Sequence, residues 1–227
     1  MKGLRDTLRV AWVIFLKDIR SEWRSREIAA GMLIFAILVI FLFNFALALD
    51  AGARADVSAG VLWTTLIFAG TIGLNRSLAV EKDRSCLDGL LLAPADRIAI
   101  YFGKLLINLA SMLFVALIIF PLYAWLFNVN ILHIRLLWVV LLGTLGYSTA
   151  GTLLAGMAMQ ARTREMLLPV LLFPLVLPLL VAAVRYSAGI LAGTPPFELR
   201  TWLDLLVVYD LAFMGAALWV FDWIMEE

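Results

Sequence analysis

Long apolar runs alternate with short charged segments along the whole chain. An α-helix needs about 20 residues to cross roughly 30 Å of hydrocarbon, and six of these runs have about that length or more. The pattern therefore predicts six membrane-spanning helices, near residues 28–49, 59–79, 98–127, 136–159, 166–184 and 203–225.

The fifth run and the segment after it are irregular. Pro169, Pro174 and Pro178 each delete a backbone hydrogen bond, so we expect the fifth helix to be kinked or partly unwound. Residues 185–202 are too apolar for a plain loop and too short and broken to span. This segment predicts a short re-entrant or interfacial element.

Residues 4–23 follow a different pattern, with one apolar stripe and a basic remainder. The stripe recurs at helical spacing and consists of Leu8, Trp12, Phe15, Ile19 and Trp23. A helix with a basic face, and with tryptophans on its apolar face, typically lies in the membrane interface. A cytosolic helix packed on a partner is the alternative.

Composition agrees with a membrane protein. Of the 227 residues, 64% are hydrophobic and 15% are charged, whereas a soluble domain is about half apolar and about a quarter charged. The net charge of +1 gives no indication of nucleic-acid binding, because the charges lie in loops. We predict an all-α integral membrane protein with a single domain over residues 1–227, in which an amphipathic helix (1–27) precedes a six-helix membrane domain (28–227).

Lysine and arginine residues set the expected orientation, because cytoplasmic loops carry an excess of them. They are concentrated in the N-terminal arm, in the loop after the second run and in the loop after the fourth. The opposite loops hold fewer, namely Arg54, Arg135, Arg185 and Arg200. Both termini are therefore expected to face the cytoplasm.

The chain lacks the residue sets that membrane enzymes use. Its one histidine, His133, excludes a histidine-rich metal site, and a lone histidine in an outer loop is more often solvated than a heme ligand. Gly103 and Lys104 are followed by Leu105, without the upstream glycine or the hydroxyl of a Walker A loop. We expect a non-catalytic subunit without a cofactor of its own, so that any ATP is hydrolysed by another chain.

Ionisable groups inside spans are costly and often functional. Asp210 is the candidate intramembrane polar site, about 10 Å into the last span if that span begins at Leu203. It either lines a cavity or pairs with Arg185 or Arg200. Lys104 can extend its amine toward the cytoplasmic side.

The charged island at residues 81–97, EKDRSCLDGLLLAPADR, interrupts the apolar pattern between the second and third spans. Ser85 and Asp88 have the spacing of a capping box, and Pro94 ends the short helix that would follow. The leucines of this helix share one face. The segment at residues 81–97 therefore predicts a short helix on the membrane surface that contacts either lipid or a protein.

An interfacial turn is one interpretation of this segment, and a knob that fits a cleft on a cytosolic ATPase is the other. In the second interpretation the knob carries the motion of the ATPase to the spans. The residues that would make the contact are the leucines, the flanking charges and the proline: Glu81, Arg84, Leu87, Leu90, Leu91, Leu92 and Pro94.

These features resemble the heme exporter protein B family (CcmB). The loop AVEKDRSCLDGLLLAPADRIAIYFGKLL is similar to the family's loop, in which a charged stretch precedes a leucine triplet, a small residue and a proline. GVLWTTLIFAGTIGLNRSL is similar to the family's second span, with Trp63 and Arg76 in the expected places. The likeness covers nearly the whole chain and is weakest beyond Gly193.

The resemblance implies an ABC-2-like permease subunit in the bacterial inner membrane, acting in cytochrome c maturation. It implies a partner ATPase (CcmA), a heme-handling membrane subunit (CcmC) and a small auxiliary subunit (CcmD). Such a permease would couple ATP hydrolysis to heme export or to release of the heme-loaded chaperone (CcmE). A six-span half also needs a second half to enclose a pathway, so we expect a homodimer surrounded by lipid. The alternative is an ABC-2 permease that exports a lipid or another hydrophobic substrate.

Overall fold

A computed structural model describes residues 2–46, 51–83, 97–128, 133–158 and 164–224, and these form α-helices joined by short connections. The helices are α1 (Lys2–Ser25), α2 (Glu27–Ala46), α3 (Ala51–Asp83), α5 (Arg97–Phe127), α6 (Ile134–Ala158), α7 (Arg164–Leu191) and α8 (Pro196–Ile224). Within these ranges, every helix except α1 contains a segment long and apolar enough to cross a membrane. The prediction of an all-α protein with six spans is confirmed.

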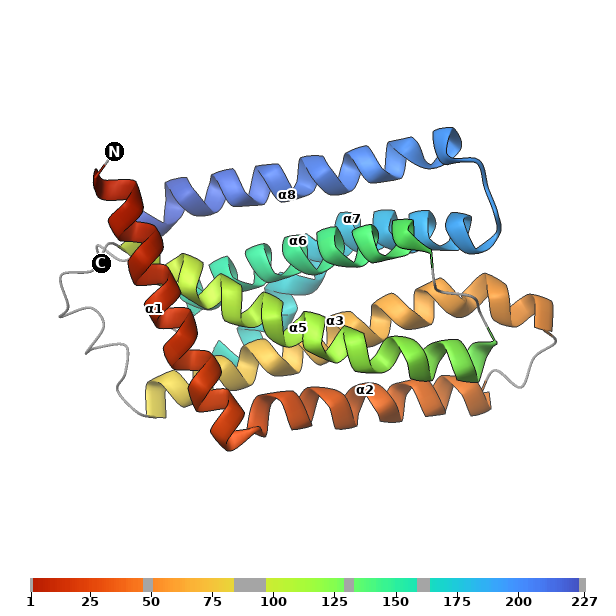
Figure 1. The fold of residues 1–227 in the computed structure, drawn as a ribbon, viewed down its shortest axis with the longest axis horizontal. Helices are drawn as coiled ribbons and strands as arrows, with labels where there is room; N and C mark the ends of the chain where they lie inside the picture. The colour runs from red at the N-terminus through yellow and green to blue at the C-terminus, as the bar shows by residue number, and fades with distance from the viewer. Residues whose placement is uncertain (1, 47–50, 84–96, 129–132, 159–163, 225–227) are drawn as a thin grey trace.

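The six long helices run side by side, and α1 crosses one end of the bundle at a steep angle (Figure 1). The C-terminal end of α8 lies at this same end, as an even number of crossings requires. So do the end of α3 and the beginning of α5, which flank the charged island at residues 81–97.

Packing of α1 on α5 uses a face that the apolar stripe does not include. Ala11 and Ile14 are buried, and Gly103 of α5 lies so close that a Cβ there would come within 2.7 Å of Ile14. Trp12 and Trp23 stay largely exposed in the chain, at 54% and 75%. Three of the five stripe residues, Leu8, Trp12 and Trp23, therefore stay exposed, while a separate face holds α1 on the bundle.

A tight corner joins α1 to α2. Arg26 adopts a left-handed conformation, with φ of 56°, and its N–H donates to the Glu22 carbonyl at 2.6 Å. The Glu22 side chain accepts a hydrogen bond from the Ala29 N–H at 2.8 Å. The first contact closes the last turn of α1, and the second satisfies a backbone donor in the first turn of α2.

Residues 185–202 do not form a separate element, so the prediction of a re-entrant or interfacial piece is wrong. Helix α7 continues to Leu191, and Gly193 (φ 75°) begins a tight turn. The N–H groups of Gly193 and Thr194 donate to the carbonyls of Ile190 and Gly189, which is the Schellman arrangement at a helix end. Pro196 then opens α8, where its missing N–H costs nothing.

The three prolines of the fifth span lie inside α7, which runs as one helix from Arg164 to Leu191. Of the two alternatives expected for this span, partial unwinding is therefore wrong, and a kink stays a prediction. Proline is tolerated in spanning helices when neighbouring helices compensate for the lost backbone hydrogen bonds. Both α6 and α8 pack against α7.

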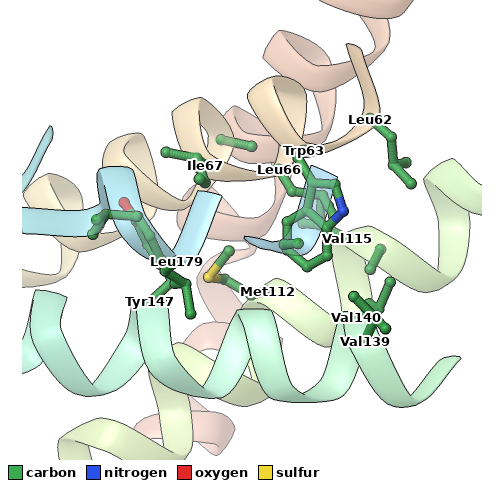
Figure 2. Close-up of a cluster of buried hydrophobic side chains, with 14 of the residues drawn as sticks. Leu62, Trp63, Leu66, Ile67, Met112, Val115, Val139, Val140, Tyr147 and Leu179 are labelled. Carbon is green, nitrogen blue, oxygen red and sulfur yellow. The ribbon is translucent and has the colours of Figure 1, made fainter. Parts of the chain in front are cut away.

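The core of the bundle lies between α3, α5, α6 and α7. Trp63 of α3 is 1% exposed, and its indole N–H donates to the Ser187 hydroxyl of α7 at 2.9 Å. Its ring occupies the space beside Gly143 of α6, among the apolar side chains that Figure 2 shows. Thr71 and Tyr147 share a hydrogen bond of 2.7 Å between α3 and α6. These polar contacts fix the register of apolar helices that would otherwise slide.

Candidate functional site

The residues proposed for ATPase contact fall mostly outside the described part of the chain. Glu81 lies in the last turn of α3, but its side chain is outside the described part of the structure. The other members of the set, Arg84, Leu87, Leu90, Leu91, Leu92 and Pro94, lie outside the described residues. Their contact with an ATPase stays a prediction, and the structure contributes the positions of the two helices on either side.

Both flanking helices are tied to the α1–α2 corner by ion pairs. Arg76 Nη2 of α3 lies 2.8 Å from Glu27 Oε2 at the start of α2, and both side chains are about half exposed. Lys104 Nζ of α5 lies 2.6 Å from Asp18 Oδ2 of α1. A displacement of α3 or α5 at this end would therefore reach α1 and α2 through charged contacts as well as through packing.

The Lys104–Asp18 pair was not foreseen from the sequence, which only placed the Lys104 amine near the cytoplasmic side. The two side chains are 14% and 16% exposed, so the pair is largely buried between α1 and α5. Asp18 follows Ala11 and Ile14 on the packed face of α1 at helical spacing. The signal available in the sequence was an acidic residue at helical spacing from small and apolar residues that turn out to be buried.

Asp210 lies deeper than expected. Since α8 begins at Pro196, the residue is about 21 Å along the helix at 1.5 Å per residue, near the middle of the span. It is 7% exposed, and neither carboxylate oxygen has a hydrogen-bond partner among the described residues. It forms no ion pair with Arg185 or Arg200 there, and Arg200 instead lies 3.7 Å from Asp204.

The surroundings of Asp210 are tightly packed. Oδ1 occupies the space that a side chain at Gly146 of α6 would need, and Leu179 of α7 lies beside the same glycine. The carboxylate is therefore enclosed where α6, α7 and α8 meet. A carboxylate without a partner in such surroundings is costly, which makes Asp210 the strongest single candidate for a functional group inside the membrane.

His133 lies just before α6, and its side chain is exposed. The beginning of α6 lies at the end of the bundle opposite α1 (Figure 1). Within the described ranges, no group of three or more histidine, cysteine, aspartate or glutamate side chains could hold a metal ion.

Comparison with known proteins gives one consistent result. Residues 9–222 match the family model described as CcmB protein. Heme exporter protein B of Rhodobacter capsulatus is 29% identical over 213 residues, which cover 88% of this chain and 94% of that protein. The proteins of the same name from Paracoccus denitrificans (26% over 208 residues) and Pseudomonas aeruginosa (22% over 200 residues) are covered to 92% and 90%, again over 88% of this chain.

Proposed function

Because the chain belongs to the CcmB family, we propose that it is the permease subunit of an ABC-type heme exporter in the bacterial inner membrane. The observation that carries this proposal is the match of nearly the whole chain, spans and charged island together, to proteins named heme exporter protein B. The match favours this function over the export of a lipid or another hydrophobic substrate.

A separate cytosolic ATPase (CcmA-like) supplies the energy in this proposal. The sequence has no Walker A loop, so the chain itself would not hydrolyse ATP. Residues 81–97 would be the contact, with Leu87, Leu90 and Leu91 as the apolar anchor. The positions of α3 and α5 support this role, because both reach the end of the bundle from which the contact would extend (Figure 1).

The same proposal fixes orientation and partners. Both termini and residues 81–97 would face the cytoplasm, in line with the distribution of lysine and arginine. A heme-handling membrane subunit (CcmC-like), a small auxiliary subunit (CcmD-like) and a second copy of this chain would complete the complex.

Heme would be a substrate of the complex and not a cofactor of this chain. His133, the single histidine, is exposed at the end of the bundle opposite α1, away from the core. Its position supports a subunit that transmits force, either to export heme or to release a heme-loaded chaperone (CcmE-like), over one that ligates iron.

Complementation tests the proposal directly. A bacterium without its own heme exporter protein B is expected to make no mature c-type cytochromes. Expression of this chain together with its cognate ATPase should restore covalent heme staining in that strain. Membrane insertion of the chain without recovery of any c-type cytochrome would contradict the proposed function.

A further inference from the structure

A groove with a volume of about 360 Å³ lies beside the corner between α1 and α2. Its walls come from α1, α2 and α5, which pack on one another at this end of the bundle. Small side chains on α2 and α5 leave the space open, at Ala29, Ala30 and Ala110. Larger apolar side chains complete the walls, namely Ile19, Trp23, Leu33, Ile107 and Phe114.

The groove opens toward lipid and continues into the membrane span of α2. Ala30 and Phe114 are exposed on its rim, and Trp23 of α1 is 75% exposed. The span of α2 begins at Glu27, so Leu33, six residues later, lies about 9 Å into it. An apolar groove at this depth lies where the acyl chains of lipids are found.

One base and one acid line the groove. Arg26 is exposed at the corner, where its φ of 56° turns it out of the helical path of α1, and it forms no ion pair among the described residues. Glu22 is half-buried, and its Oε1 accepts the Ala29 N–H at 2.8 Å. The other carboxylate oxygen of Glu22 has no such partner in the described ranges, so it can accept from a ligand.

The other charged groups near this corner are engaged elsewhere. Lys104 pairs with Asp18, and Arg76 pairs with Glu27. Three further cations of α1 line a separate hollow of that helix, at Lys17, Arg20 and Arg24. The groove itself therefore combines apolar walls with one positive and one negative group. This combination matches a zwitterion that carries a hydrocarbon chain.

We propose that the groove binds one phospholipid with a primary-amine, zwitterionic headgroup, phosphatidylethanolamine. Arg26 contacts the phosphate, as guanidinium groups do well, and Glu22 accepts an N–H from the ammonium. An acyl chain lies along Ala30, Leu33 and Phe114. Phosphatidylglycerol has no cation for Glu22, and the quaternary amine of phosphatidylcholine has no N–H to donate. The site does not depend on the substrate proposed above.

Native mass spectrometry of the full chain, purified in detergent, measures the number and affinity of bound lipids. Phosphatidylethanolamine, phosphatidylcholine and phosphatidylglycerol are added in turn, with identical acyl chains. We expect one phosphatidylethanolamine per chain to bind at least about threefold more tightly than the other two, the scale of one partly exposed charge contact. Equal affinities would mean surrounding lipid without a site, and tighter binding of phosphatidylglycerol would mean an anionic ligand. Either result would overturn the proposal.

Alanine variants test the position of the site. Ala30→Phe fills the groove from an exposed position and should remove the tightly bound phosphatidylethanolamine. Ala212→Phe adds the same side chain at an exposed position of α8 and should keep it. Unchanged binding in Ala30→Phe, or equal loss in both variants, would refute the groove as the site.

Headgroup variants test the two charged contacts, and they decide the point if Ala30→Phe fails to accumulate. Glu22→Gln can still accept the Ala29 N–H but carries no charge, so the preference for phosphatidylethanolamine over phosphatidylcholine should disappear. Arg26→Asn suits a left-handed backbone and should weaken binding at least about threefold. Arg26→Lys keeps the charge and should bind within about twofold of the wild type. A preference that survives Glu22→Gln would contradict the proposal.

Discussion

At the scale of single residues, the Lys104–Asp18 pair is the charged contact that holds α1 on α5. Removing one partner of a largely buried pair leaves an uncompensated charge, at a cost of about 3 kcal/mol. We therefore expect Asp18→Asn to lower the free energy of unfolding by about this amount. Lys104→Met should cost less, because Lys17 Nζ lies 3.2 Å from Asp18 Oδ1 and remains as a partner.

Denaturant unfolding in mixed micelles measures both effects. Asp204→Asn is the matched control, because its pair with Arg200 is long and mostly exposed, so the free energy of unfolding should change by less than about 1 kcal/mol. Equal stability of Asp18→Asn and Asp204→Asn would show that burial of the Lys104–Asp18 pair does not contribute to the free energy of unfolding.

Gly146 is the residue that makes room for Asp210. A methyl group there would meet Asp210 Oδ1, Leu179 and the Tyr209 ring at once, so Gly146→Ala should cost about 1–3 kcal/mol of unfolding free energy through overpacking. Gly215 of α8 has nothing within 4 Å of a Cβ. Gly215→Ala should therefore be neutral or stabilising by up to about 1 kcal/mol.

Thermal unfolding of the two glycine variants in detergent checks this difference. Addition of Asp210→Ala to Gly146→Ala should recover part of the loss, because it removes the oxygen from the contested space. A Gly146→Ala variant as stable as Gly215→Ala would mean that α6 and α8 are not in close contact at Asp210.

His133 is expected to be dispensable. It is exposed beside the start of α6 and lies away from the core, so His133→Ala should leave cytochrome c maturation near the wild-type level. The purified subunit should also carry no stoichiometric heme. The absorption spectrum of the isolated protein decides the point, since a heme band that disappears in His133→Ala would place a heme site in this chain.

At the scale of elements, the turn between α7 and α8 has one residue that needs glycine. Gly193 has φ of 75° and open space around it, so Gly193→Ala should lose about 1–2 kcal/mol through backbone strain alone. Gly60→Ala, also with nothing within 4 Å but inside α3, should show no loss. The unfolding midpoints of the two variants separate strain from packing, and equal midpoints would refute the left-handed turn.

The elements could be predicted from the sequence to the extent that hydrophobic pattern determines them. The third span was expected over residues 98–127 and is observed as Arg97–Phe127. This long apolar run contains a single charged residue, Lys104, and lies between Arg97 and the polar Asn128. Residues 185–202 were misread, because Gly193, Pro195 and Pro196 interrupt the apolar pattern but form only the short turn between α7 and the start of α8. Here the backbone hydrogen bonds of a four-residue turn decided the structure, and a pattern of apolar positions does not contain them.

The candidate site could be predicted only in part. The unusual position of Asp210 followed from its charge inside an apolar run, but its neighbours Gly146 and Leu179 come from two other helices. The Lys104–Asp18 pair likewise joins residues 86 positions apart. Contacts between helices depend on how the bundle assembles, and the periodicity of one helix says nothing about which residue of another helix it meets.

At the scale of the whole molecule, α1 and the flanks of residues 81–97 meet at one end of the bundle (Figure 1). Ion pairs link α3 and α5 there to the α1–α2 corner. This arrangement suits a subunit that receives force at one end and distributes it to several spans. We propose that a partner ATPase delivers this force through the leucines of residues 81–97.

Copurification of the ATPase with the tagged wild-type chain and with two leucine variants tests this contact. Leu90→Asp and Leu91→Asp should stay in the membrane but retain much less ATPase, because a charge placed in an apolar contact is left unpaired. Cys86→Ser, in the same segment, is the control and should bind as the wild type does. Wild-type amounts of ATPase on both leucine variants, with normal cytochrome c maturation, would contradict binding through these leucines.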